Sequence, residues 1–141
     1  MRQVYLLSSD QLDHYWPEIA QLLTEVPGFY DYYTPEWAYS AAKKGDLQVW
    51  ALSDEEIRAI VLTQILCFPR QKTFEVLAAG GAGLLDFVNE MEETFNLIAH
   101  SAGCATITGK VRPGLAKMFG DRATQRYVAL TRPVREPERR Q

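Results

Sequence analysis

The chain has 141 residues, of which 47% are hydrophobic and 23% charged, and its formal net charge is −3 at pH 7. These values are ordinary for a folded domain, so the composition excludes extensive disorder, and the length suffices for one hydrophobic core. The acidic balance predicts no nucleic-acid partner, and the lack of a long uncharged apolar run predicts no contact with a membrane.

The first third of the chain predicts one short strand and two helices. Residues 4–7 read as the strand, and the hydroxyl and carboxyl side chains that follow can cap a helix extending to about Thr24. A second helix is expected to start with Thr34 as its cap and Pro35 at its first position, and to end at Gly45.

The middle of the chain predicts three strands joined by short turns. Residues 47–52 alternate apolar and polar side chains, residues 57–68 form a longer β-rich run, and residues 73–77 form a third. Strands that follow one another through short turns pair most readily as antiparallel neighbours. We therefore expect an antiparallel meander.

The pattern then changes from β to helical periodicity. Residues 79–83 read as a glycine-rich turn, residues 84–102 as a helix that Gly103 ends, and residues 104–108 as a strand. A crossover helix makes the strands on either side of it parallel, and the backbone N–H groups of such a turn can hold a phosphate. The apolar stripe of the helix consists of Leu84, Phe87, Val88, Met91, Phe95, Ile98 and Ala102.

The C-terminal part predicts a short helix at residues 112–119 and a last strand at residues 125–131. One domain is therefore expected over residues 1–132, followed by a tail at 133–141. The tail mixes three arginines with two glutamates and two prolines. Alone it should be extended and mobile, and a neighbouring molecule would be needed to order it.

The order strand, two helices, three meander strands, helix, strand, helix, strand resembles the GNAT superfamily of acyl-CoA N-acyltransferases. The resemblance implies an α/β fold with a mixed sheet, in which an antiparallel meander is joined to a parallel strand–helix–strand unit that splays apart. It also implies that acetyl-CoA lies between the splayed strands, with its pyrophosphate at the turn of residues 77–84. The implied cofactor-binding residues are Leu77, Ala79, Gly80, Gly81, Ala82 and Gly83.

Two side chains are candidates for catalysis under this resemblance. Glu75 could act as general base towards an acceptor amine, or it could be a solvent-facing carboxylate of an alternating strand. Tyr127 could act as general acid, or it could simply pack in the last strand. The turn lacks the Gln or Arg with which the family's motif begins, and residues 114–119 lack the family's Tyr. Binding of acetyl-CoA and catalysis therefore both stay open.

A nearer likeness is to the divergent GNAT-like proteins of tailed bacteriophages. It rests on Gly80-Gly81, on Gly103-Cys104 and on Gly109-Lys110. This likeness implies a phage origin, with the protein either in the host cytoplasm or in the virion. Three functions follow as hypotheses: an acyltransferase, a virion structural or accessory protein without catalysis, and a binder of CoA or a small molecule without turnover.

An aromatic segment that follows the first helix and continues into the second has three possible roles. Its rings could form the wall of an acceptor site, anchor a phage protein together with the tail, or pack between helices. The rings are those of Phe29, Tyr30, Tyr32, Tyr33, Trp37 and Tyr39.

The cysteines and histidines give no sign of a metal site. Cys67 and Cys104 lack C-x-x-C spacing and are expected to be buried free thiols, and His14 and His100 have no partners at ligand spacing.

Overall fold

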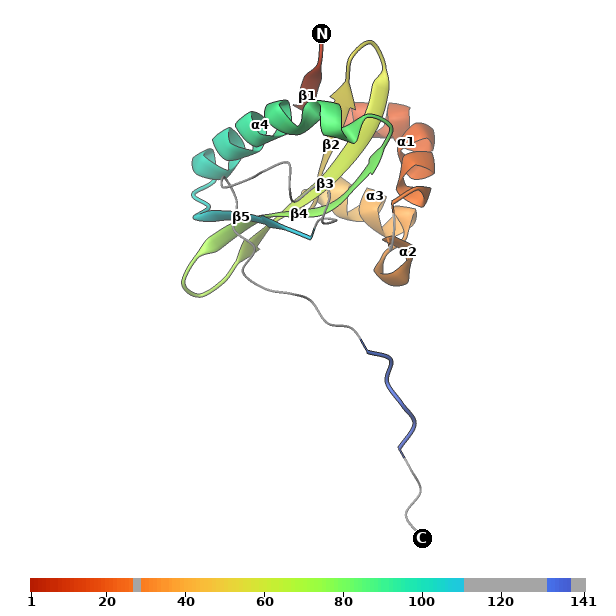
Figure 1. The fold of residues 1–141 in the computed structure, drawn as a ribbon, viewed down its shortest axis with the longest axis vertical. Coiled ribbons are helices and arrows are strands. Elements are labelled where there is room, and N and C mark those ends of the chain that lie inside the picture. Colours follow the sequence, from red (N-terminus) through yellow and green to blue (C-terminus); the bar gives the residue numbers. More distant parts are fainter. Residues whose placement is uncertain (27–28, 111–131, 138–141) are drawn as a thin grey trace.

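The computed structural model describes residues 1–26, 29–110 and 132–137. The first two ranges form a mixed sheet with helices on both faces (Figure 1). In chain order the elements are β1 (Gln3–Leu6), α1 (Ser9–Thr24), α2 (Phe29–Tyr32), α3 (Pro35–Lys44), β2 (Gln48–Ser53), β3 (Ile57–Cys67), β4 (Lys72–Gly81), the 3-10 helix η1 (Leu84–Phe87), α4 (Val88–Ser101) and β5 (Thr106–Gly109). The expected helix at 112–119 and strand at 125–131 lie outside the described residues.

The N-terminal helices begin and end where the local chemistry predicts. Ser8 and Gln11 form a reciprocal cap on α1, in which each side chain accepts a hydrogen bond from the other residue's backbone N–H. Thr34 accepts from the backbone N–H of Trp37 at 3.1 Å, Pro35 is the first residue of α3, and Gly45 ends that helix with φ 85°. Both predicted helices are confirmed.

The strands lie in the order β1-β2-β3-β4-β5. The pairs from β1 to β4 are antiparallel, as the short turns predict. β5 pairs with β4 in parallel, from Thr73 opposite Thr106 to Val76 opposite Gly109. The predicted mixed sheet and its parallel crossover are therefore confirmed.

β4 contains a bulge that changes which residues face each side of the sheet. Leu62 pairs with Ala78 and Thr63 pairs with Val76, so Leu77 is an extra residue on β4. Because side chains alternate along a strand, one extra residue reverses the alternation beyond it. Glu75, before the bulge, and Gly80, after it, consequently face the same side.

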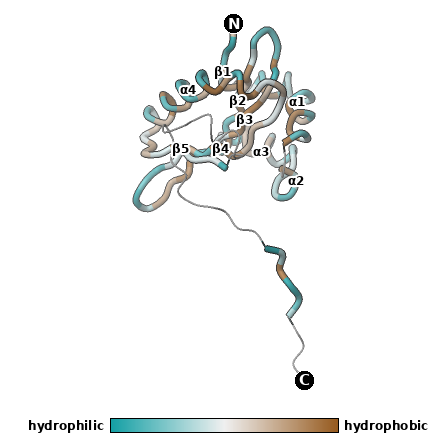
Figure 2. The backbone as a smooth tube through the Cα atoms, viewed as in Figure 1, coloured by the Kyte–Doolittle hydropathy of each residue, from teal (hydrophilic) through white to brown (hydrophobic). Residues whose placement is uncertain are grey.

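Each face of the sheet has its own hydrophobic core. On one face, Phe95 of α4 packs against Trp50 and Phe74, with ring centroids 5.1 and 5.4 Å apart. On the other face, α1 and α3 cover the residues Val49, Ala51, Ile60 and Leu62. Figure 2 shows that the hydrophilic residues gather at the tips of the β2–β3 and β3–β4 hairpins and in the tail.

The crossover helix buries a different set of residues from the predicted apolar stripe. Phe87, Val88 and Phe95 are buried as expected, but Met91 is only half-buried and Ile98 is 36% exposed. Residues 84–87 form a 3-10 helix with three residues per turn, so the α-helical stripe starts only at Val88 and continues to Phe95 and a buried Ala99.

Two smaller expectations near this helix are also corrected. β5 begins at Thr106 and not at Cys104, because the backbone N–H of Cys104 still donates to the carbonyl of Ala99 at the helix end. Cys67 is exposed and not buried, because it is the last residue of β3 before the hairpin turn, while Cys104 is half-buried.

Gly80 lets the end of α1 lie directly on the sheet. A Cβ atom at this position would lie 2.5 Å from Cγ2 of Val26, a stiff β-branched side chain. We expect Gly80→Ala to lower the free energy of unfolding by about 1–3 kcal/mol. The same change in a Val26→Ala background should cost less, and a double-mutant cycle by urea unfolding measures the difference. Equal costs in both backgrounds would contradict this packing.

Candidate active site

β4 and β5 pair over only part of their length and then separate. Their pairing ends at Val76 and Gly109, whereas β4 continues to Gly81 in contact with β3. Among the described residues, the edge of β4 beyond Val76 therefore has no strand partner on the β5 side (Figure 1). The bulge at Leu77 lies at the same point, and a bulge increases the local twist of a strand.

Glu75 lies next to this separation. It stands opposite Gln64 of β3 and Thr108 of β5, and its Oε1 accepts a hydrogen bond of 2.8 Å from Nε2 of Gln64. No described residue donates to its Oε2. Because Phe74 points towards α4, Glu75 points to the opposite face, which α1 and α3 cover.

Hydroxyl side chains extend the polar surface around Glu75. The Oγ1 atoms of Thr73 and Thr106 lie 3.1 Å apart across β4 and β5, on the same face of the sheet as Glu75. This face therefore combines a half-buried carboxylate, an amide that orients it and hydroxyl groups. Such a set can orient a polar molecule and accept a proton. The role of Glu75 as general base stays a prediction, and Tyr127 lies outside the described residues.

The glycine-rich segment is mostly strand, which corrects the expected turn at 79–83. Ala79, Gly80 and Gly81 pair with Val61, Ile60 and Ala59 of β3. The pairing continues because β3 offers backbone partners along this whole length. It ends at Gly81, whose φ of 123° is a conformation that other residues rarely adopt.

The actual turn consists of Ala82 and Gly83, and it leads into η1. Gly83 has φ 73°, and its carbonyl accepts a hydrogen bond from the N–H of Asp86. The first N–H groups of a helix have no internal acceptor, so Leu84 and Leu85 present backbone donors here. These N–H groups and the free edge of β4 offer main-chain hydrogen bonds to a phosphate-bearing acyl-CoA.

The side chains beside this turn add little positive charge. Arg58 lies close to Gly83, but its Nη1 donates to Oδ2 of Asp54 at 2.8 Å, and the carboxylate of Asp86 lies close to the same point beside Gly83. The pKa of Asp54 falls to about 2, mainly through this bond to Arg58. Arg58 also belongs to β3, on the side of β4 opposite the free edge.

An open hollow beside Ala82 is predominantly acidic. It is lined by Met1, Asp54, Glu55, Glu56, Ile57, Arg58 and Ala82. One cationic side chain among three carboxylates does not favour several phosphate charges. The residues of this turn therefore fit an acyl-CoA through backbone groups and lack a free cationic side chain.

The aromatic segment divides into packed and exposed rings. Phe29 is 3% exposed, and Tyr39 packs against Trp16 with centroids 4.9 Å apart. Tyr30, Tyr32 and Trp37 are 54%, 74% and 41% exposed. Packing therefore explains the first two rings, while the exposed rings stay candidates for an acceptor wall or a partner contact.

Tyr39 also helps to fix α3 on α1. Its hydroxyl donates to Oδ1 of Asp13, and Nζ of Lys43 donates to Oδ2 of the same carboxylate at 2.9 Å. These two bonds, that of Tyr39 first, lower the pKa of Asp13. The bond to Asp13 in turn raises the pKa of Tyr39.

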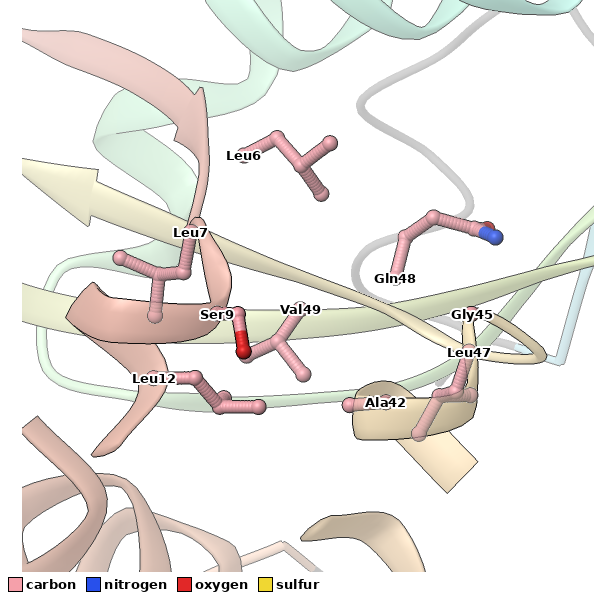
Figure 3. Close-up of a pocket in the computed structure, with 9 residues that line it drawn as sticks. All are labelled: Leu6, Leu7, Ser9, Leu12, Ala42, Gly45, Leu47, Gln48 and Val49. Carbon is pink, nitrogen blue, oxygen red and sulfur yellow. The ribbon is translucent and has the colours of Figure 1, made fainter. Parts of the chain in front are cut away.

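A separate cavity of about 250 Å³ lies near the other edge of the sheet, where β1 leads into α1 (Figure 3). Its walls are mainly aliphatic, with Gln48 at one side, and Oε1 of Gln48 accepts a hydrogen bond from Thr63.

Among the described residues no helix has the length and hydrophobicity to cross a bilayer, and no three potential ligands gather for a metal ion.

Comparison with solved structures identifies the fold. No protein-family model and no curated protein matches the sequence. An aminoglycoside acetyltransferase from an uncultured soil metagenomic sample, solved with sisomicin, has a TM-score of 0.69 at 10% identity, over 95% of this chain and 97% of that one. A GNAT family acetyltransferase of Staphylococcus aureus has a TM-score of 0.63 at 12% identity, over 94% and 98%.

A predicted acetyltransferase of Clostridium acetobutylicum, solved with acetyl-CoA, has a TM-score of 0.65 at 10% identity, over 93% of this chain and 96% of that one. These similarities span nearly the whole of each chain, although few residues are identical. The chain therefore has the fold of the GNAT N-acetyltransferases, as its order of elements predicts. Its relation to phage proteins stays a prediction.

Proposed function

We propose that this protein is an acyl-CoA-dependent N-acyltransferase that uses acetyl-CoA. The observation that carries the proposal is the position of Glu75, whose carboxylate stands where the parallel strands β4 and β5 separate. The fold alone hosts proteins of many activities, so a suitably placed proton acceptor is the stronger argument.

The binding residues would act mainly through their backbone. Leu77, Ala79, Gly80 and Gly81 border the free edge of β4, and Ala82 and Gly83 form the turn before η1. Bound acetyl-CoA would supply an acyl thioester. The side of Gly80 that faces α1 is closed by Val26, so the ligand would contact the main chain at the strand edge.

Glu75 would accept the proton of the acceptor amine, directly or through a water molecule. Gln64 would hold Oε1 and thereby leave Oε2 directed towards the amine. Tyr127, outside the described residues, is proposed as the general acid. Tyr30, Tyr32 and Trp37 belong to helices on the same face of the sheet as Glu75, which favours an acceptor site on that face.

Calorimetry with acetyl-CoA tests the proposal. We expect weak binding, because the turn offers backbone amides and Arg58 is already paired with Asp54. Nanomolar affinity would contradict this account of the turn. No detectable heat at millimolar acetyl-CoA would contradict the acyltransferase itself.

Turnover is measured as the release of CoA thiol in the presence of a panel of primary amines. Cys67 is exposed and would react with a thiol reagent, so a Cys67→Ser variant gives the clean background. Binding of acetyl-CoA without thiol release for any amine would identify a binder without turnover.

A second candidate is a structural or accessory protein of phage origin that has this fold and no catalysis. The exposed rings of α2 and α3 and the exposed residues 132–137 favour it, because both would gain from contact with a partner. Co-purification with phage particles would support a place in the virion. Acetyl transfer at a measurable rate, with no association with particles, would exclude it.

A further inference from the structure

Four aromatic rings lie together on the surface, and packing within the fold does not account for their exposure. This aromatic patch consists of Tyr30 and Tyr32 on α2, Tyr33 directly after α2, and Trp37 in the first turn of α3. Tyr33 and Trp37 stack with centroids 4.7 Å apart, and Tyr32 lies 6.3 Å from Tyr33. Apart from half-buried Tyr33, the rings of the patch are exposed.

The aromatic patch also carries negative charge. Asp31 and Glu36 are exposed beside its rings, and residues 29–37 contain no Lys or Arg. Aromatic faces attract guanidinium groups and stack on proline rings, and carboxylates bind arginine through paired hydrogen bonds. The patch therefore has the chemistry to recognise an extended segment rich in proline and arginine.

The C-terminal tail of this chain has that composition. Residues 132–141 contain four arginines, two glutamates and two prolines. Residues 132–137 are in neither helix nor strand, all are exposed, and Val134 is 98% exposed. Figure 1 shows this part of the tail extending away from the sheet and helices. Proline restricts the backbone to extended conformations, so such a segment loses little entropy when it binds.

We propose that the aromatic patch of one copy binds the C-terminal tail of a second copy. The charges are complementary, because a tail with a surplus of arginine meets a patch whose charged residues are acidic. The tail's described residues extend away from their own domain, which favours exchange between copies. Reciprocal exchange places two such contacts in one symmetric dimer, and the second contact then forms at a high effective concentration.

The test uses the full-length protein, a variant that lacks residues 132–141, and a labelled peptide of residues 132–141. Light scattering should show that the full-length protein dimerises with increasing concentration and that the shortened protein stays monomeric. The peptide should bind the shortened protein with micromolar affinity, measured by fluorescence anisotropy, since the contact is small. Higher salt should weaken this binding.

Two single variants locate the contact. Tyr32→Ala changes a ring that is 74% exposed, so it should fold normally and weaken peptide binding at least about tenfold, a typical loss at an aromatic anchor. Leu97→Ala removes an apolar side chain on α4 that is 64% exposed, and it should leave binding unchanged.

The outcomes are distinct. Dimerisation that requires both the tail and Tyr32 supports the proposal. A monomeric full-length protein that no longer binds the peptide would mean that the tail occupies the patch of its own chain, which overturns exchange between copies. No peptide binding, or binding that Tyr32→Ala does not weaken, would also overturn it.

Discussion

Replacing Glu75 with glutamine is expected to lower the rate of acetyl transfer by about 10²–10⁴-fold, the usual contribution of a positioned general base. Glutamine has nearly the same shape and can still accept a hydrogen bond from Gln64 through its amide oxygen, so the sheet should stay intact. What it loses is the ability to take a proton. The measurement is the turnover rate at saturating acetyl-CoA and amine, with far-UV circular dichroism to confirm the fold.

The matched control is Glu93→Gln, which removes a carboxylate from the exposed side of α4. It should leave the rate unchanged, because α4 covers the opposite face of the sheet from Glu75. If Glu75→Gln retained turnover within about twofold of the parent, Glu75 would not be the base, and its role would be limited to its contact with Gln64.

Truncating Phe95 to alanine is expected to lower the free energy of unfolding by about 3–5 kcal/mol. Phe95 is 4% exposed and touches the rings of Trp50 and Phe74, so its loss leaves a cavity between α4 and the sheet. Urea unfolding measures the change, since a shift of the midpoint at constant slope reports stability directly.

Leu97→Ala is the control for this effect, because Leu97 lies on the same helix and is 64% exposed. Its cost should stay within about 0.5 kcal/mol. If Phe95→Ala cost less than about 1 kcal/mol, α4 would not be held by the packing seen here, and the assignment of its buried face would be wrong.

The elements that sequence alone predicts well are those with local causes. Ser8, Thr34 and Gly45 act on the few residues next to them, so the starts of α1 and α3 and the end of α3 can be predicted from neighbouring side chains. The parallel pairing of β4 and β5 follows equally from the crossover helix between them.

The elements that sequence does not predict depend on partners far along the chain. Gly80 and Gly81 have low intrinsic strand preference, yet they belong to β4 because β3 offers Ile60 and Ala59 for pairing. The sequence also does not show that the crossover helix starts as a 3-10 helix. In so short an apolar segment, three residues per turn and 3.6 residues per turn give nearly the same pattern. Within α4, Ala99 and not Ile98 faces the core.

The candidate site shows the same division. The resemblance in the order of elements implies Glu75 as a candidate, because it places this carboxylate on the strand beside the splay, whereas alternation along the strand by itself allows a solvent-facing carboxylate. Its partner Gln64 can be found only from the strand register of β3 and β4, which runs without a shift from the hairpin turn to this pair. The bulge at Leu77 lies beyond the pair and changes the register on the way to Gly83. Arg58 beside Gly83 was missed for the same reason, since pairing with β3 brings it there.

The connection between β4 and β5 also has a consequence for the order in which the chain folds. β2, β3 and β4 are joined by tight hairpins, so their contacts close short loops, whereas β5 can pair only after the whole crossover helix is in place. We expect the hairpins to form early and β5 to join late. Glu75 and Thr108 would then come together only in the last stage, when the rest of the sheet already exists. A chain that is still folding, or a variant with a weakened α4, would have the carboxylate in place without the strand that completes its surroundings.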